Sequence, residues 1–168
     1  MDKKLSRGVS RRNLEPGSVK AVGVWFLCNQ TGRYLYLLRN DPKHPGTWGL
    51  PGGKTEAGET LLGTMERECI EELGSFPVYT KLLPLEKFTS ADGIFEYNTW
   101  VCVVEQEFVP VLNDEHVGYA WIVKSHQPKP MHPGLWSTVN IDAVQTKLAV
   151  VEQQELRSEE HTSELQSH

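Results

Sequence analysis

A cluster of glutamates on one short predicted helix constrains this chain more than any other feature. Glu71 and Glu72 follow Glu68 by three and four residues, so a helix places all three on one face. Like charges at this spacing weaken a helix, and the face therefore favours a compensating cation. Rigidly held oxygen ligands suit Mg²⁺ or Mn²⁺. The alternative is a solvated acidic helix face.

The opposite face of the same helix is apolar. Four side chains recur at helical period, namely Leu62, Met65, Cys69 and Leu73. We expect this stripe to pack against a core. Thr60 or Glu59 would begin the helix, and Gly74 fits a left-handed C-cap.

The segment before the helix is rich in glycine and proline. Residues 45–60 read PGTWGLPGGKTEAGET, which predicts a tight loop whose backbone can approach a ligand. A loop, a helix and clustered carboxylates in succession are what a site for a metal and a phosphate requires.

The stretch from Gly53 to Gly74 resembles the signature of the Nudix hydrolases. That signature is a glycine, five residues, a glutamate, seven residues, Arg-Glu, a hydrophobic residue, any residue, Glu-Glu, any residue, a glycine and a hydrophobic residue. The matching positions here are Gly53, Glu59, Arg67, Glu68, Cys69, Glu71, Glu72 and Gly74. Ser75 occupies the last hydrophobic position, and we interpret Phe76 as the packing residue shifted by one. A looser likeness extends from residue 19 to residue 151.

The resemblance implies roles for the matching residues. Four would hold the metal, namely Gly53 through its carbonyl, Glu68, Glu71 and Glu72. Arg67 would pair with Glu59 and hold the loop against the helix, as residues behind metal ligands commonly do. The alternative for this pair is an ordinary surface ion pair, which contributes little.

The resemblance also implies the reaction, which is metal-dependent hydrolysis of a pyrophosphate bond in a nucleoside diphosphate derivative, with water attacking phosphorus. The general base would be a glutamate of the signature, Glu71 or Glu72, or else Glu115, which precedes a predicted strand. The alternative for Glu115 is an ordinary loop acid. We expect His116 beside it to be a surface or hydrogen-bonding histidine.

Substrate contacts are less constrained. Arg39 and Lys54 flank the loop and could bind phosphate oxygens, the alternative being surface charge. Aromatic side chains could stack on a base, and we expect Trp25 and Tyr97 to do so, although strand alternation sends some aromatics to the core. Nucleotide sugars, ADP-ribose, dinucleoside polyphosphates and (d)NTPs are not separated by the sequence. Two alternative functions are a glycosyl hydrolase of the GDP-mannose type and a non-catalytic nucleotide sensor.

The rest of the chain predicts a scaffold. Residues 18–28 and 33–39 predict one hairpin, residues 78–90 and 94–106 a second, and residues 119–124 a further strand. Pro84 would lie at an edge or break. Residues 138–154 predict a second amphipathic helix. Strands between two helices indicate an α/β sandwich. The resemblance implies an α/β/α sandwich with a mixed central sheet and two main helices.

Composition fits one enzyme domain. The chain has 168 residues and a net charge of −5, which disfavours nucleic acid as the main partner. We expect a small nucleotide as partner, leave a homodimer open, and expect no membrane span and a cytoplasmic location. Three separated cysteines predict buried thiols.

We divide the chain into a flexible basic arm (1–17), the Nudix domain (18–156) and a tail (157–168). The tail has no apolar period and resembles the conceptual translation of a sequencing adapter. The competing interpretation is an ordinary disordered or partly helical end. HPGTW at 44–48 and HPGLW at 132–136 are a short echo, which we interpret as coincidence rather than a repeat, with both copies able to edge a cleft.

Overall fold

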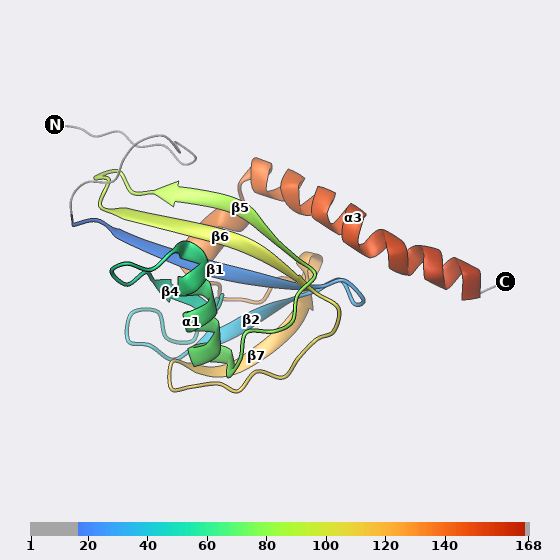
Figure 1. Ribbon diagram of the computed structural model, residues 1–168, viewed down its shortest axis with the longest axis horizontal. Helices are drawn as coiled ribbons and strands as arrows, with labels where there is room; N and C mark the ends of the chain where they lie inside the picture. Colours follow the sequence, from blue (N-terminus) through green and yellow to red (C-terminus); the bar gives the residue numbers. More distant parts are fainter. Residues whose placement is uncertain (1–16, 167–168) are drawn as a thin grey trace.

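A mixed sheet with helices on both faces forms the protein (Figure 1). The computed structural model describes the backbone of residues 17–166 and the side chains as far as residue 156. The strands are β1 (Val19–Cys28), β2 (Arg33–Arg39), β3 (Trp48–Gly49), β4 (Gly52–Lys54), β5 (Lys81–Thr89), β6 (Phe95–Val104) and β7 (His116–Val123). The helices are α1 (Leu61–Leu73), the 3-10 helix η1 (Lys124–His126), α2 (Pro133–Val139) and α3 (Asp142–Gln166). The expected α/β sandwich is confirmed.

The sheet is mixed because β1 and β6 run parallel, whereas β1 pairs antiparallel with β2 and β6 pairs antiparallel with β5. The strand order is β3-β2-β1-β6-β5, with β4 paired to β1 and β7 paired to β2. Both predicted hairpins are therefore present. Pro84 lies in the edge strand β5, beside a register shift between Pro84 and Glu86, where its missing N–H is tolerated.

Alternation along the strands divides the interior into two cores. Val24 and Phe26 of β1 face α1, and pack with Met65 and Cys69 of that helix. Trp25 and Leu27 face the other side, where α2 and α3 cover the sheet. Figure 1 shows α1 in front of the sheet, and α3 beginning beside β5 and running past the edge of the sheet to the C-terminus. Each face of the sheet is buried by a helix, as a two-sided core requires.

Local chemistry sets both ends of α1. The Thr60 hydroxyl oxygen accepts a 3.0 Å hydrogen bond from the amide of Gly63 and begins the helix. Gly74 ends it at φ 88°, a left-handed conformation that costs glycine little, and its N–H donates to the carbonyl of Ile70. Both predicted caps are confirmed.

The apolar stripe of α1 begins one residue earlier than predicted. Met65, Cys69 and Leu73 are buried as expected, but Leu62 is 52% exposed, so its assignment to the core was wrong. Leu61 packs against the core in its place. The reason is helical phase, since Leu61 precedes Met65 by four residues and lies closer to its face than Leu62 does.

Phe76 makes the core contact that the signature assigns to the residue directly after Gly74. Ser75 is exposed, whereas Phe76 packs against the α1 core with its ring centroid 6.4 Å from that of Phe26. The packing residue is shifted by one, as interpreted from the sequence.

Several boundaries differ from the predictions. The strand expected at 119–124 begins at His116, and the helix expected at 138–154 is divided into α2 and α3 at Asn140. The short strands β3 and β4 were not predicted, because two or three residues carry too little periodicity. α3 continues to Gln166, past the expected boundary at residue 157. The basic arm, up to residue 16, lies outside the described residues. No helix within residues 17–166 has the length and apolar character needed to span a membrane.

Candidate active site

Glu72 is the most unusual side chain of α1, because it is a carboxylate in the protein interior. It is 3% exposed, and its Oε2 accepts a 2.7 Å hydrogen bond from the amide of Gly52 at the start of β4. Burial raises the pKa of Glu72 to about 9, the Gly52 amide opposes that shift, and nearby Glu68 and Glu115 add to it. The metal-free carboxyl group is therefore largely protonated at neutral pH, and its ionised form has no cationic partner among the described residues.

Glu115 and His116 complete a compact group with Glu72. One ligand atom from each of the three lies within 4.8 Å of the others. The Nδ1 atom of His116 is 3.9 Å from Oε1 of Glu72 and has no hydrogen-bond partner among the described residues. Burial lowers the pKa of His116 to about 4, and Arg39 adds to that effect, so the ring is neutral. His116 is thus a buried residue, rather than the surface histidine that was one of its expected states.

Backbone contacts fix the loop that carries Glu115. The Glu115 amide donates to the side-chain oxygen of Asn113, and the Asn113 amide group donates to the Glu71 carbonyl at the end of α1. The Glu115 carbonyl accepts from the amide of Asn40 after β2. The loop is therefore attached to both elements that bound the site, while the Glu115 side chain stays exposed.

Arg67 connects the loop before α1 to the acidic face of the helix. Its Nε donates to Glu59 at 2.7 Å, one terminal nitrogen donates to the Lys54 carbonyl at 2.9 Å, and the other donates to Glu68 at 2.9 Å. These hydrogen bonds hold the pKa of Glu59 at about 2, chiefly through Arg67. An arginine fork that joins two carboxylates and a carbonyl is more than an isolated surface ion pair.

Gly53 brings the backbone of β4 against Glu68. A Cβ atom at Gly53 would lie 2.4 Å from Oε1 of Glu68, so a larger residue here would force the Glu68 carboxylate to move. Burial raises the pKa of Glu68 despite its bond to Arg67, and Glu71 and Glu115 add to the shift. Glu71 itself points outward, with its side chain 54% exposed and 3.7 Å from Arg67.

These residues fit a divalent cation. One ion could reach three groups. These are the buried Glu72 carboxyl group with its raised pKa, the exposed Glu115 carboxylate, and the neutral His116 ring, whose Nδ1 has no hydrogen-bond partner among the described residues. Such a donor set is costly without a cation and favourable with one. Within residues 17–156, the structure brings Glu68 and Glu72 to this region with Glu115, and leaves Glu71 at its rim.

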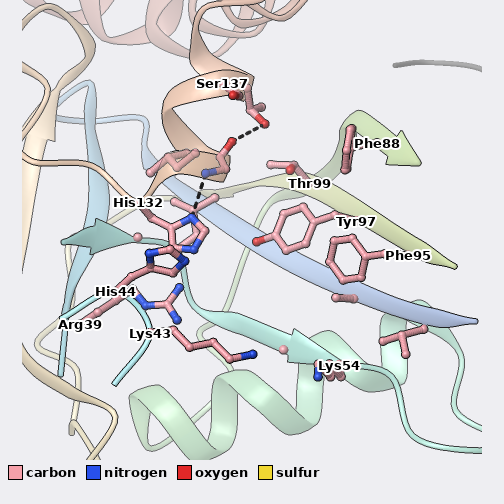
Figure 2. A pocket seen from close by; sticks show the side chains of 18 of the residues that line it. Arg39, Lys43, His44, Lys54, Phe88, Phe95, Tyr97, Thr99, His132 and Ser137 are labelled. Carbon is pink, nitrogen blue, oxygen red and sulfur yellow. Dashed lines mark hydrogen bonds between the residues drawn. The ribbon is translucent and has the colours of Figure 1, made fainter. Parts of the chain in front are cut away.

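A cavity of about 690 Å³ opens on the opposite face of the sheet, beside Gly53. Its floor is formed by Val19 and Ala21 of β1, and aromatic residues of β5 and β6 form one wall. The other wall carries basic groups, namely Arg39, Lys43, His44 and His132 (Figure 2). Gly53 lines the cavity and also contacts Glu68, so the cavity adjoins the carboxylates across the backbone of β4.

The four residues predicted to contact the substrate do not all lie at the cavity. Arg39, Lys54 and Tyr97 line the cavity. Trp25 does not, because it points from the same face of β1 into the core beneath α2 and α3 and is fully buried. Its expected stacking role is therefore corrected to a packing role. The Tyr97 hydroxyl lies over Gly23, where a Cβ atom would be 2.0 Å away, so Gly23 makes room for this side chain.

Sequence reasoning did not place His44 and His132 together at a cavity. The two rings contact one another at the cavity wall, with centroids 4.5 Å apart and an interplanar angle of 77°. Backbone hydrogen bonds join their segments, from Trp48 to Pro130 and from His132 to Trp48. The repeated HPG triplet was the signal available in the sequence, and its expected place at the edge of a cleft is confirmed.

Comparisons with known proteins agree with this geometry. A family model described as NUDIX domain matches residues 17–139. Nucleoside triphosphatase NudI of Escherichia coli O17:K52:H18 (strain UMN026 / ExPEC) is 34% identical over 109 residues, which cover 57% of this chain and 77% of that protein.

Solved structures share the fold. The Nudix hydrolase RenU from M. smegmatis gives a TM-score of 0.58 at 20% identity, covering 80% of this chain and 84% of that one. The MutT NUDIX hydrolase from Burkholderia pseudomallei gives a TM-score of 0.54 at 23% identity, covering 75% of this chain and 96% of that one. With the signature residues gathered at one site, these similarities show that the chain belongs to the Nudix hydrolase family.

Proposed function

We propose that this protein hydrolyses a phosphoric anhydride bond of a nucleotide, with Mg²⁺ or Mn²⁺ as cofactor and water attacking phosphorus. The observation that carries the proposal is the buried Glu72 carboxyl, held by Gly52 beside Glu115 and an orphaned His116 nitrogen. Hard oxygen donors favour a hard divalent cation, and a structural role alone gives no reason to bury Glu72 and His116 next to the exposed Glu115.

The cation would be held by Glu68 and Glu72, with Glu71 at the rim and the Gly53 carbonyl from β4. A bound divalent cation would neutralise phosphate oxygens and make an attacking water more acidic. Arg67 keeps Glu68 oriented through its own hydrogen bond. This assignment agrees with the family resemblance and with the close approach of Gly53 to Glu68.

Glu115 is our candidate for the general base. Glu72 is buried and its Oε2 is engaged by Gly52, whereas Glu115 is exposed on a loop next to it. An exposed carboxylate can take a proton from water and release it to solvent. Glu115 therefore suits proton transfer better than Glu72 does.

A nucleoside triphosphate is the substrate class we favour. NudI, the relative at 34% identity, is described as a nucleoside triphosphatase. The cavity joins a basic wall to an aromatic wall, which suits phosphates at one end and a base at the other. Arg39 and Lys54 would contact phosphate oxygens, and Tyr97 would contact the nucleoside.

The test is a panel of nucleotides incubated with Mg²⁺ or Mn²⁺, with products identified by mass. The panel contains (d)NTPs, ADP-ribose, nucleotide sugars and dinucleoside polyphosphates. We expect metal-dependent cleavage between phosphorus atoms, with (d)NTPs turned over fastest. Free sugar with an intact nucleoside diphosphate would indicate the glycosyl hydrolase alternative, and binding without turnover would indicate a sensor.

A matched pair of variants ties the activity to the site. Glu72→Gln removes the ionisable carboxyl group but keeps the shape of the side chain, and we expect it to abolish turnover. Glu66→Gln makes the same change on an exposed part of α1 and should leave turnover unchanged. Full activity in Glu72→Gln contradicts the proposal.

A further inference from the structure

Some of the donor atoms on the basic wall of the cavity have no hydrogen-bond acceptor among the described residues. Nε of Arg39 donates to Asp41 at 2.6 Å, but no bond from its terminal nitrogens to another described residue is seen. Lys43 is exposed beside it on the same wall. Figure 2 shows both side chains next to His44 and His132, across the cavity from Tyr97 and Phe95. A wall made of donors favours an anionic ligand.

His132 has a fixed proton arrangement. Its Nδ1 accepts a 3.0 Å hydrogen bond from the amide of Gly134 and so begins α2. Burial, together with the nearby charge of Arg39, lowers the pKa of His132 to about 4, so the ring is neutral. A neutral imidazole carries one proton, and because Nδ1 is an acceptor, that proton resides on Nε2. His132 therefore presents an N–H donor at its second nitrogen.

The surroundings hold this ring in place. His44 contacts it at a 4.5 Å centroid distance, and the amide of His132 donates to the Trp48 carbonyl. The Cβ of His132 lies 3.8 Å from the position that a Cβ of Gly49 would take. Ring contact, backbone bond and helix cap together fix the direction of the donor, which is what a positioned binding group needs.

We propose that His132, through Nε2–H, binds a phosphate group of the substrate at a subsite that does not require the metal ion. This inference rests on the proposed function, because it assigns a place to one part of the same substrate. Arg39 and Lys43 would supply positive charge, and His132 the directional hydrogen bond. His132 would thereby be a residue that positions the phosphate chain at the basic wall, leaving the nucleoside at the aromatic wall.

Two substitutions separate the binding role of His132 from its capping role. In His132→Asn, the amide oxygen takes the place of Nδ1 and can still cap α2, but the donor is lost. In His132→Gln, the amide nitrogen takes the place of Nε2 and can donate, but the cap is lost. A purely structural role predicts damage in the glutamine variant, and a binding role predicts it in the asparagine variant.

The experiment is calorimetric titration of the full chain with inorganic tripolyphosphate, with divalent ions removed by chelator. A hydrogen bond to a charged oxygen corresponds to about a 10-fold to 100-fold change in affinity. We expect His132→Asn to lose at least about 10-fold, and His132→Gln to stay within about 3-fold of the wild type. Thermal unfolding should show the opposite order, with His132→Asn near the wild type and His132→Gln lower.

Unchanged tripolyphosphate affinity in His132→Asn overturns the inference, as does an equal loss in both variants. Titration with the nucleoside alone is the comparison arm, and an effect of His132→Asn confined to the nucleoside also contradicts a phosphate subsite. Because no turnover is involved, this result is distinct from the proposed function, whose failure appears as absent metal-dependent hydrolysis by the wild type.

Discussion

The amide of Gly52 donates a 2.7 Å hydrogen bond to Oε2 of Glu72, which lies twenty residues later in the chain. This bond joins the start of β4 to the last turn of α1 and holds a carboxyl group in the interior. One backbone amide opposes the effect of burial on the pKa of Glu72, which still rises to about 9. Without a cation the Glu72 carboxyl group is therefore largely protonated at neutral pH, and a bound cation would favour its ionised form.

The raised pKa of Glu72 predicts a pH-dependent cost in the metal-free protein. Since the folded-state pKa exceeds the unfolded one, the contribution of Glu72 to stability is complete below about pH 4.5 and is lost as pH rises towards about 9. With chelator present, Glu72→Gln should therefore unfold at a higher temperature than the wild type at about pH 8, with a difference that shrinks at lower pH. Adding Mg²⁺ should stabilise the wild type alone. A lower unfolding temperature for metal-free Glu72→Gln at the higher pH would count against this account.

Gly53→Ala tests the contact between β4 and the acidic face of α1. The new methyl group would lie 2.4 Å from Oε1 of Glu68 and displace that carboxylate. Misplacement by about 1 Å can cost roughly 100-fold in rate, so we expect a loss of turnover of that order. Gly118→Ala is the control, because its methyl group would meet Leu38 at an ordinary 3.6 Å. Similar turnover in the two variants would show that the closeness of Gly53 to Glu68 has no catalytic use.

Arg67→Lys tests the link behind the metal ligands. A lysine cannot donate at once to Glu59, Glu68 and the Lys54 carbonyl, as the guanidinium does. We expect about a 10-fold to 100-fold weaker affinity for Mn²⁺ in a direct titration. Arg33→Lys alters another arginine that binds a carboxylate through two nitrogens, that of Glu107 remote from the site, and should leave the affinity unchanged. Equal Mn²⁺ affinities for the wild type, Arg67→Lys and Arg33→Lys would show that Arg67 forms only an ordinary surface ion pair.

Glu115→Gln tests the assignment of the general base. Loss of a positioned proton acceptor lowers the rate of the chemical step by about 10²-fold to 10⁴-fold, so we expect kcat to fall by that range. KM should change less, because Glu115 is not assigned to substrate binding. Glu105→Gln, an exposed residue directly after β6, is the control. An unchanged kcat in Glu115→Gln would show that Glu115 is not the general base, and a glutamate of α1 would then be the candidate.

The sequence predicted the frame of the fold because its strands and α1 have strong periodicity and clear caps. Thr60, Gly74 and the two hairpins are where local chemistry placed them. The exposed Leu62 shows the limit of such reasoning, since a helical period leaves the phase uncertain by one residue. The break at Asn140 was missed because both flanking segments carry an apolar helical pattern.

The site was predicted in part. Residues within the signature were found because their spacing is fixed along one loop and one helix, and in the structure Gly53 lies against Glu68 while the neighbouring Gly52 donates to Glu72. The burial of His116 and the contact of His44 with His132 depend on strand pairing and on a connection between distant segments. A single sequence does not encode such contacts locally, and Trp25 was misplaced for the same reason, as burial decides its role.

Hydrolysis in water enriched in oxygen-18 tests the central claim most directly. If a cation held by Glu68 and Glu72 activates water against phosphorus, the label should appear in a phosphate-bearing product, and only when Mg²⁺ or Mn²⁺ is present. Label found on a released sugar, or turnover that persists fully with the ions chelated, would contradict the account.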